Sequence, residues 1–194
     1  MPSKERYREL LEGVRDAHAE HRRAYQKARS ELGTNRKAHE VTREQLKTLN
    51  TKLNLFYETV LGPLAEPFLA GDCAAIEEVL NFLEVDVPAF RTGYSKEWYY
   101  RKLKALKLNS NQVERLREIA INRVVSAEYR REDSELRRLM IKLADLAFLV
   151  RIAELPDRAN PHVKRKKSLM FRVIVNGRKD LRKEVEDKLL RTSN

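Results

Sequence analysis

Cysteine is nearly absent from this 194-residue chain, and glycine and proline are scarce. Cys73 is the single cysteine, which excludes an internal disulfide framework and a zinc site built from several thiolates. The six glycines and six prolines are not clustered, which argues against a loop-rich or disordered chain. These scarcities favour a folded protein in a reducing compartment.

Long apolar stretches are also missing. The longest candidate runs from Leu143 to Val150 and is interrupted by Asp145, whereas a membrane-spanning helix needs about 20 apolar residues. The first residues lead directly into charged sequence with no apolar stretch behind them, so we expect no secretory signal. The sequence therefore predicts a cytoplasmic protein without a membrane span.

Sequence motifs for catalysis, metals or cofactors are missing as well. There is no phosphate-cradling glycine loop, no zinc-protease helix motif and no nucleophile elbow. His18 and His21 lie one helical turn apart, a spacing that suits a metal, but the predicted helix packing places leucines opposite them. We therefore interpret them as packed histidines and predict a non-catalytic protein with no metal and no cofactor. An enzyme with a site assembled from unremarkable residues is the least favoured alternative.

Charge and helical periodicity dominate what is present. Charged residues make up 36% of the chain against 42% apolar residues, a balance that suits helices with one apolar stripe and a wide solvated face. The net charge is +11, and residues 95–107 (+4) and 156–194 (+7) together account for all of it. A localised excess of this kind is typical of a surface that contacts polyanions.

Residues 1–61 have the pattern of a long antiparallel helical hairpin, coiled-coil-like in its spacing. Two apolar seams alternate in steps of four and three residues, with Gly33 between them as the helix break. The first seam is Tyr7, Leu11, Val14, His18, His21, Tyr25, Ala28 and Leu32; the second is His39, Thr42, Leu46, Leu49, Leu53, Phe56 and Val60. Their antiparallel register places His18 opposite Leu49. The seam is apolar at the base of the hairpin, near Tyr7 and Val60, and more polar at the tip, near Gly33.

The rest of the chain divides into an acidic connector, residues 62–94, and a basic helical domain, residues 95–194. Gly62 and Pro63 should end the hairpin, and Asp72 should cap a short helix. The basic domain should contain helices near 95–107, 110–130, 134–155 and 161–176, with a last short helix after Gly177. The helix at 134–155 is apolar nearly all round and should be the most buried. The fold class predicted is therefore all-α, a hairpin followed by an irregular multi-helix domain.

Two basic segments are candidate nucleic-acid contacts. On the helix 95–107, four side chains share a face beside the apolar stripe: Lys96, Tyr100, Lys104 and Lys107. The densest positive region follows residue 162 and contains Lys164, Arg165, Lys166, Lys167, Arg172, Arg178, Lys179 and Arg182. Converging lysines and arginines neutralise phosphates, and an exposed tyrosine among them can stack on a base. The alternatives are a solvated face, contact with an anionic membrane surface, or a weak helix-turn-helix pattern at Asn109–Ser110.

Together these features predict a non-catalytic protein that binds DNA or RNA through backbone phosphates, independent of sequence. Residues 1–61 would then serve as an arm for a protein partner or for self-association. The alternative function is a protein–protein interaction or scaffold subunit of a larger complex, with no nucleic-acid contact.

Overall fold

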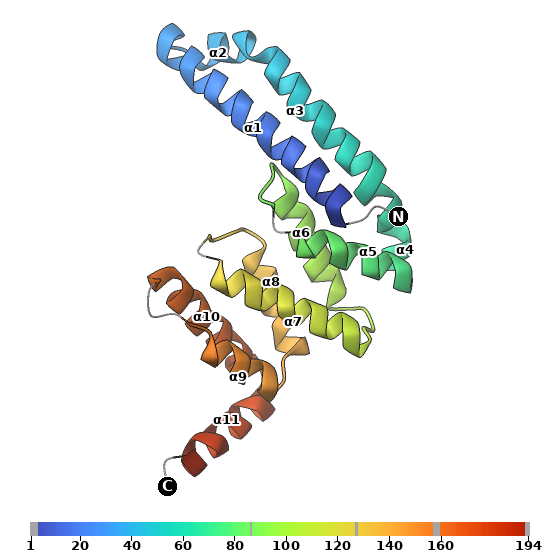
Figure 1. Cartoon of the computed structure of the whole chain (residues 1–194), viewed down its shortest axis with the longest axis vertical. Coiled ribbons are helices and arrows are strands. Elements are labelled where there is room, and N and C mark those ends of the chain that lie inside the picture. The colour runs from blue at the N-terminus through green and yellow to red at the C-terminus, as the bar shows by residue number, and fades with distance from the viewer. Residues whose placement is uncertain (1–3, 86, 127, 157–159, 193–194) are drawn as a thin grey trace. The chain divides into compact units, whose positions relative to one another are not determined.

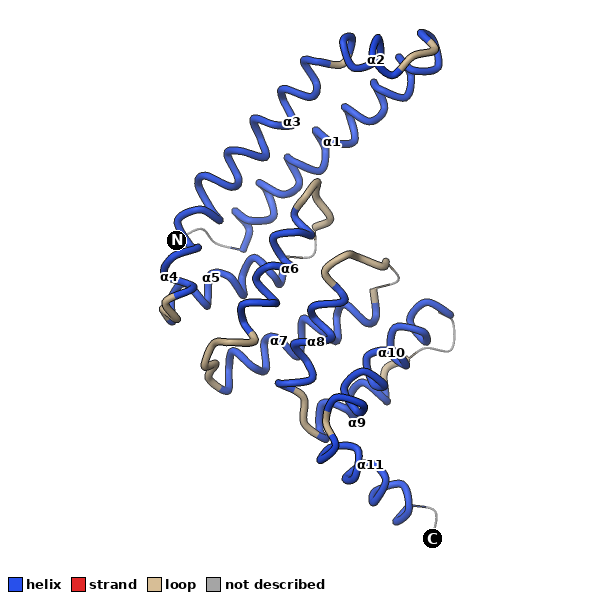
Figure 2. The backbone as a smooth tube through the Cα atoms, turned by 180° about the vertical axis from the view of Figure 1, so that it is seen from behind, coloured by secondary structure: helices blue, strands red, loops and turns tan. Residues whose placement is uncertain are grey.

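The computed structural model describes residues 4–85, 87–126, 128–156 and 160–192, with side chains described as far as residue 185. Regular structure in these residues is entirely helical, as Figure 2 shows, and no strand occurs among them. The all-α prediction is confirmed. The chain divides into two compact units, residues 1–93, which include the hairpin and residues 62–93 of the acidic segment, and residues 94–194.

The first unit begins with the hairpin. Helix α1 (Lys4–Leu32) packs against α2 (Asn35–Val41) and α3 (Arg43–Phe56), which return along it (Figure 1). Gly33 has a φ of +69°, and its N–H donates to the Arg29 carbonyl at 3.0 Å. This left-handed turn costs least for a residue without Cβ, which is why the long first helix ends there.

The returning arm is not the single helix that its seam predicts. It is interrupted at Thr42, whose φ of −96° and ψ of +15° depart from helical values and whose buried hydroxyl donates to the Ala38 carbonyl at 2.9 Å. At the other end a π-helical turn, η1 (Tyr57–Leu61), leads directly into α4 (Gly62–Leu69). The Gly62 N–H donates to the Tyr57 carbonyl, and Pro63 stands in the first turn of α4, where no N–H is needed. Gly62 therefore begins the short helix that follows the hairpin, and the helical backbone continues through this point.

The apolar base of the hairpin packs on α5 (Cys73–Glu84). The rings of Tyr7 and Phe56 are buried, with centroids 6.2 Å and 5.7 Å from the ring of Phe82. The Tyr7 hydroxyl donates to the buried carboxylate of Glu78 at 3.0 Å, which satisfies both polar groups inside the core. Asp72 caps α5 by accepting the Ala75 N–H at 2.7 Å, as predicted.

His18 lies in a different place from the one the seam predicts. Its half-buried ring stacks on Phe90 at a centroid distance of 4.7 Å, and Ala17 takes the buried position in α1. Partial burial lowers the pKa of His18, and the positive charges of Arg22 and His21 lower it further. The neutral ring is therefore the form that the folded state prefers.

This preference predicts a pH dependence of stability. The pKa of His18 is lower in the folded state than the ~6.5 of an unfolded chain. The contribution of neutral His18 to the free energy of unfolding is therefore complete above pH ~6.5 and is lost as the pH falls toward the lower pKa of the folded state. Between pH 7.5 and 5.5, wild type should lose more free energy of unfolding than His18→Gln does. Urea denaturation followed by circular dichroism measures the difference, with His39→Gln, an exposed histidine of the same unit, as control. Equal losses in wild type and His18→Gln would contradict the packing of His18 on Phe90.

The second unit contains most of α6 (Thr92–Leu103), then α7 (Ser110–Val125), α8 (Asp133–Leu143), α9 (Leu146–Glu154), α10 (Pro161–Gly177) and α11 (Lys179–Thr192). Helix α10 packs against α7, α8, α9 and α11 and is the hub of this unit. The predicted helix at 134–155 is two helices. Asp145 divides them because its side chain accepts the Phe148 N–H at 2.8 Å and caps α9.

No helix among the described residues is both long enough and apolar enough to cross a bilayer.

Candidate nucleic-acid interface

The basic face predicted on residues 95–107 does not form. Helix α6 ends at Leu103, so Lys107 is exposed but lies beyond the helix. Lys96 and Tyr100 are buried, and Lys104 pairs with the buried carboxylate of Glu135 at 2.8 Å. The hydrogen bond from Lys104 lowers the pKa of Glu135, and Arg138 contributes in the same direction. Lys96 and Tyr100 are therefore not phosphate contacts as predicted, because a buried side chain cannot reach a phosphate.

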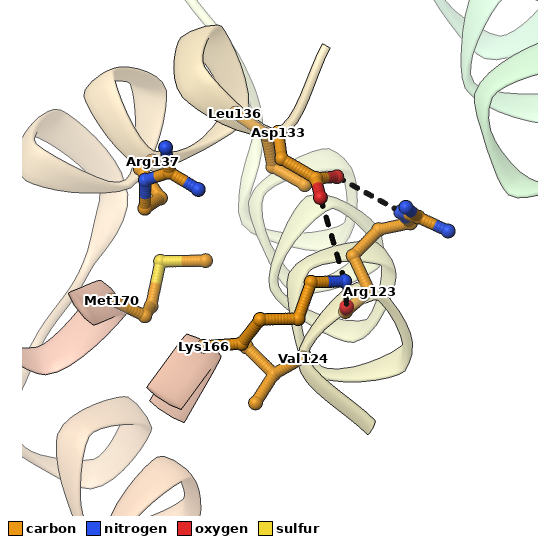
Figure 3. Close-up of a pocket in the computed structure, with 7 residues that line it drawn as sticks. All are labelled: Arg123, Val124, Asp133, Leu136, Arg137, Lys166 and Met170. Carbon is orange, nitrogen blue, oxygen red and sulfur yellow. Dashed lines mark hydrogen bonds and ion pairs between the residues drawn. The ribbon is translucent and has the colours of Figure 1, made fainter. Parts of the chain in front are cut away.

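Lys166, in the densest basic run, is also buried, with 4% of its surface exposed. Its ammonium donates to the carbonyls of Arg123, Ser126 and Glu128 at 2.6, 2.9 and 2.5 Å. It also lies 3.4 Å from one carboxylate oxygen of Asp133. The other oxygen of Asp133 accepts a hydrogen bond from the Arg123 guanidinium at 3.1 Å (Figure 3). Burial lowers the pKa of Lys166, and the Asp133 carboxylate opposes that change. Lys166 is therefore a structural residue rather than a phosphate contact.

The bonds made by Lys166 belong to a pattern that recurs through the second unit. A helix ends with unpaired carbonyls and a partial negative charge, and a cation there satisfies both. Lys166 caps the C-terminal end of α7. Lys142 caps the C-terminal end of α6 by donating to the Lys104 and Leu106 carbonyls at 2.8 and 3.3 Å. Lys167 serves α9 by donating to the Leu155 carbonyl at 2.9 Å.

Two arginines donate to the carbonyls at the end of α8, one from α7 and one from the junction of α10 and α11. Arg117 donates twice to the Leu143 carbonyl, at 3.0 and 2.7 Å, and Arg178 donates to the Ile141 and Ala144 carbonyls at 3.3 Å. Arg178 also binds Asp180 through both oxygens, at 2.8 and 2.5 Å, which lowers the pKa of that carboxyl to about 2. Part of the positive charge in this unit is therefore used to join short helices.

The remaining predicted residues are exposed. Lys164, Arg165 and Arg172 lie on the solvent side of α10, whereas Lys179 and Arg182 lie on α11. No residue of α10 is acidic, and among the described residues no carboxylate pairs with these three cations of α10. Arg165 and Arg172 are seven residues apart and so share one helix face, with Lys164 about a quarter-turn round the helix from them. We call Lys164, Arg165 and Arg172 the α10 cationic face.

Tyr129 adds an aromatic ring to this surface that the sequence did not single out. It lies in the turn before α8 with 47% of its surface exposed, and Arg165 and Lys166 lie 5.9 and 5.4 Å from its ring centroid. The ring of His162, in the first turn of α10, meets it edge-on at 6.1 Å. A tyrosine inside the charged stretch 128–133 was the available signal, because a large ring in a short polar turn has little core to enter.

The cavity described beside this surface is too small for a substrate. The cavity between Lys166 and Met170 measures about 10 Å³, which is room for one water molecule (Figure 3). Within the described ranges, no group of three or more histidine, cysteine or acidic side chains is arranged to hold a metal ion. Comparisons with protein-family models, curated protein sequences and solved structures found no match to this chain.

Proposed function

We propose that this protein binds nucleic acid through backbone phosphates, using the α10 cationic face. The observation that carries the proposal is the contrast within one helix. Lys166 and Lys167 of α10 are engaged with backbone carbonyls, whereas Lys164, Arg165 and Arg172 face solvent on a helix without a single acidic residue.

An exposed cluster of this kind has an electrostatic cost that a polyanion removes. Cations on one helix face repel one another, and neutralisation by phosphates relieves that repulsion and releases counterions into solution. The exposed Lys179 and Arg182 extend the positive region onto α11, where the acidic side chains Asp180 and Glu184 partly offset them. We therefore place the main contact on α10.

Fluorescence anisotropy with labelled random oligonucleotides tests this proposal. Binding should be measurable at about 50 mM salt and more than tenfold weaker at about 200 mM, because roughly three phosphate contacts release a corresponding number of counterions. Absence of binding to both single and double strands at the lower salt concentration would overturn it.

We propose that the hairpin serves as the arm for self-association or for a protein partner. Leu32 and Val41, near the tip, are large apolar side chains that remain exposed. Burial of these two side chains against another protein surface would remove apolar area from water. Sedimentation velocity of wild type and of Leu32→Ser/Val41→Ser tests the self-association form, which requires a concentration-dependent larger species that the variant lacks.

A further inference from the structure

Tyr129 distinguishes the α10 cationic face from an ordinary patch of positive charge. The tyrosine stands in the turn between α7 and α8, and the first turns of α10 bring His162, Arg165 and Lys166 to its ring. Arg165 is a neighbour of this ring and also a member of the α10 cationic face. The exposed ring is therefore continuous with the cations that the proposed function assigns to phosphates.

A second exposed tyrosine in the same unit already has a cation packed over its ring. Tyr94 is 59% exposed, but the guanidinium of Arg131 lies over its ring at only 4.1 Å from the centroid. Arg131 is itself paired with the carboxylate of Glu97 at 2.5 Å. The cations near Tyr129 are more distant from its ring, and Arg165 has no carboxylate partner among the described residues.

An aromatic ring beside unbalanced cations suits one form of nucleic acid better than the other. In a duplex the bases are stacked on one another, and their faces are closed to a side chain. A single strand offers the face of each base to an aromatic ring while its phosphates remain available to lysine and arginine, and such stacking tolerates any sequence. A phosphate surface without the ring would not discriminate in this way.

We infer that the surface binds single-stranded nucleic acid, with one base stacked on Tyr129 and the neighbouring phosphates on Lys164, Arg165 and Arg172. This inference rests on the proposed function and specifies its ligand. Arg165 and Arg172 are about 10 Å apart along the helix, so the site spans a strand of a few nucleotides.

Substitution of Tyr129 tests the stacking contact. Tyr129→Ala should weaken binding of a labelled oligothymidine by roughly 5- to 150-fold, the range measured for one lost base–aromatic stack, and should leave duplex binding nearly unchanged. Tyr129→Phe keeps the ring and should bind as wild type does. Tyr94→Ala, which removes a more exposed tyrosine already covered by Arg131, is the matched control and should also bind as wild type does.

The outcomes separate the two proposals. If Tyr129→Ala binds the single strand as tightly as wild type, or weakens single strand and duplex equally, the stacking contact is wrong while the phosphate surface stands. If wild type binds neither form at about 50 mM salt, the proposed function itself fails. Photocrosslinking to a strand containing 5-iodouracil gives an independent readout, and its adduct should map to the peptide that contains Tyr129.

Discussion

Replacement of Lys166 by methionine is expected to lower the free energy of unfolding of the second unit by about 3 kcal/mol. Methionine keeps most of the apolar stem but removes the ammonium, so three carbonyls lose a donor and Asp133 loses an ion-pair partner. Trp98 is the single tryptophan of the chain and belongs to this unit, so its fluorescence during urea denaturation reports the change.

Lys164→Met is the matched control for this prediction. Lys164 lies two residues away on the same helix and is exposed, so its replacement should change the free energy of unfolding by less than about 0.5 kcal/mol. Equal urea midpoints for the two variants would mean that Lys166 does not hold the end of α7. Replacement of all four residues 164–167 by glutamate would not be a clean test of binding. A carboxylate at position 166 would face Asp133 and destabilise the unit, so lost binding could not be told apart from unfolding.

Neutralisation of the α10 cationic face is expected to weaken oligonucleotide binding by roughly 100-fold or more at low salt, with no loss of stability. In Lys164→Gln/Arg165→Gln/Arg172→Gln, each replaced side chain loses a charge-assisted hydrogen bond to phosphate, and such bonds contribute about 1.5–3 kcal/mol each. Fluorescence anisotropy measures the binding, and Trp98 fluorescence during denaturation confirms that the unit remains folded.

The control for that variant is an equal loss of charge elsewhere. Arg23→Gln/Lys27→Gln/Lys47→Gln removes three exposed cations of the hairpin and lowers the net charge by the same amount. Its affinity should stay within a few-fold of wild type. If this control weakens binding as much as the α10 variant does, attraction by the overall charge rather than by the α10 cationic face explains the binding.

Local patterns in the sequence predicted the helices because helices are held by local bonds. Asp72 was predicted as a cap and accepts the expected backbone N–H, and the stretch after Asn160 forms a helix despite its β-branched residues. The break at Asp145 was missed because the apolar run on either side outweighs one residue in any periodicity. Only the cap that Asp145 supplies to Phe148 reveals that the run is two helices.

The partner of each cation was the part that the sequence could not supply. Lys142, Lys166 and Arg178 donate to carbonyls between 34 and 43 residues away, and no local pattern encodes where those helix ends lie in space. One clue was nevertheless available for burial. Val163, Lys166, Met170 and Ile174 follow the spacing of a single helix face, so a lysine stood within the apolar stripe that packs inward.

The same clue applies to α6. Lys96, Tyr99 and Leu103 share a face by their spacing, and all three are buried. A cation on an apolar stripe is therefore better interpreted as a candidate for capping another helix than as a surface charge. Where such buried cations occur, the net charge of a segment overestimates the number of phosphates that it can bind.

The measurement that tests the α10 cationic face most directly is the salt dependence of oligothymidine binding, compared between wild type and the three-residue glutamine variant of α10. Three phosphate contacts predict a slope of about −2 for the logarithm of the association constant against the logarithm of salt concentration in wild type. The variant should have a slope near zero and weak residual binding. A variant whose slope equals that of wild type would contradict the assignment of phosphate binding to Lys164, Arg165 and Arg172.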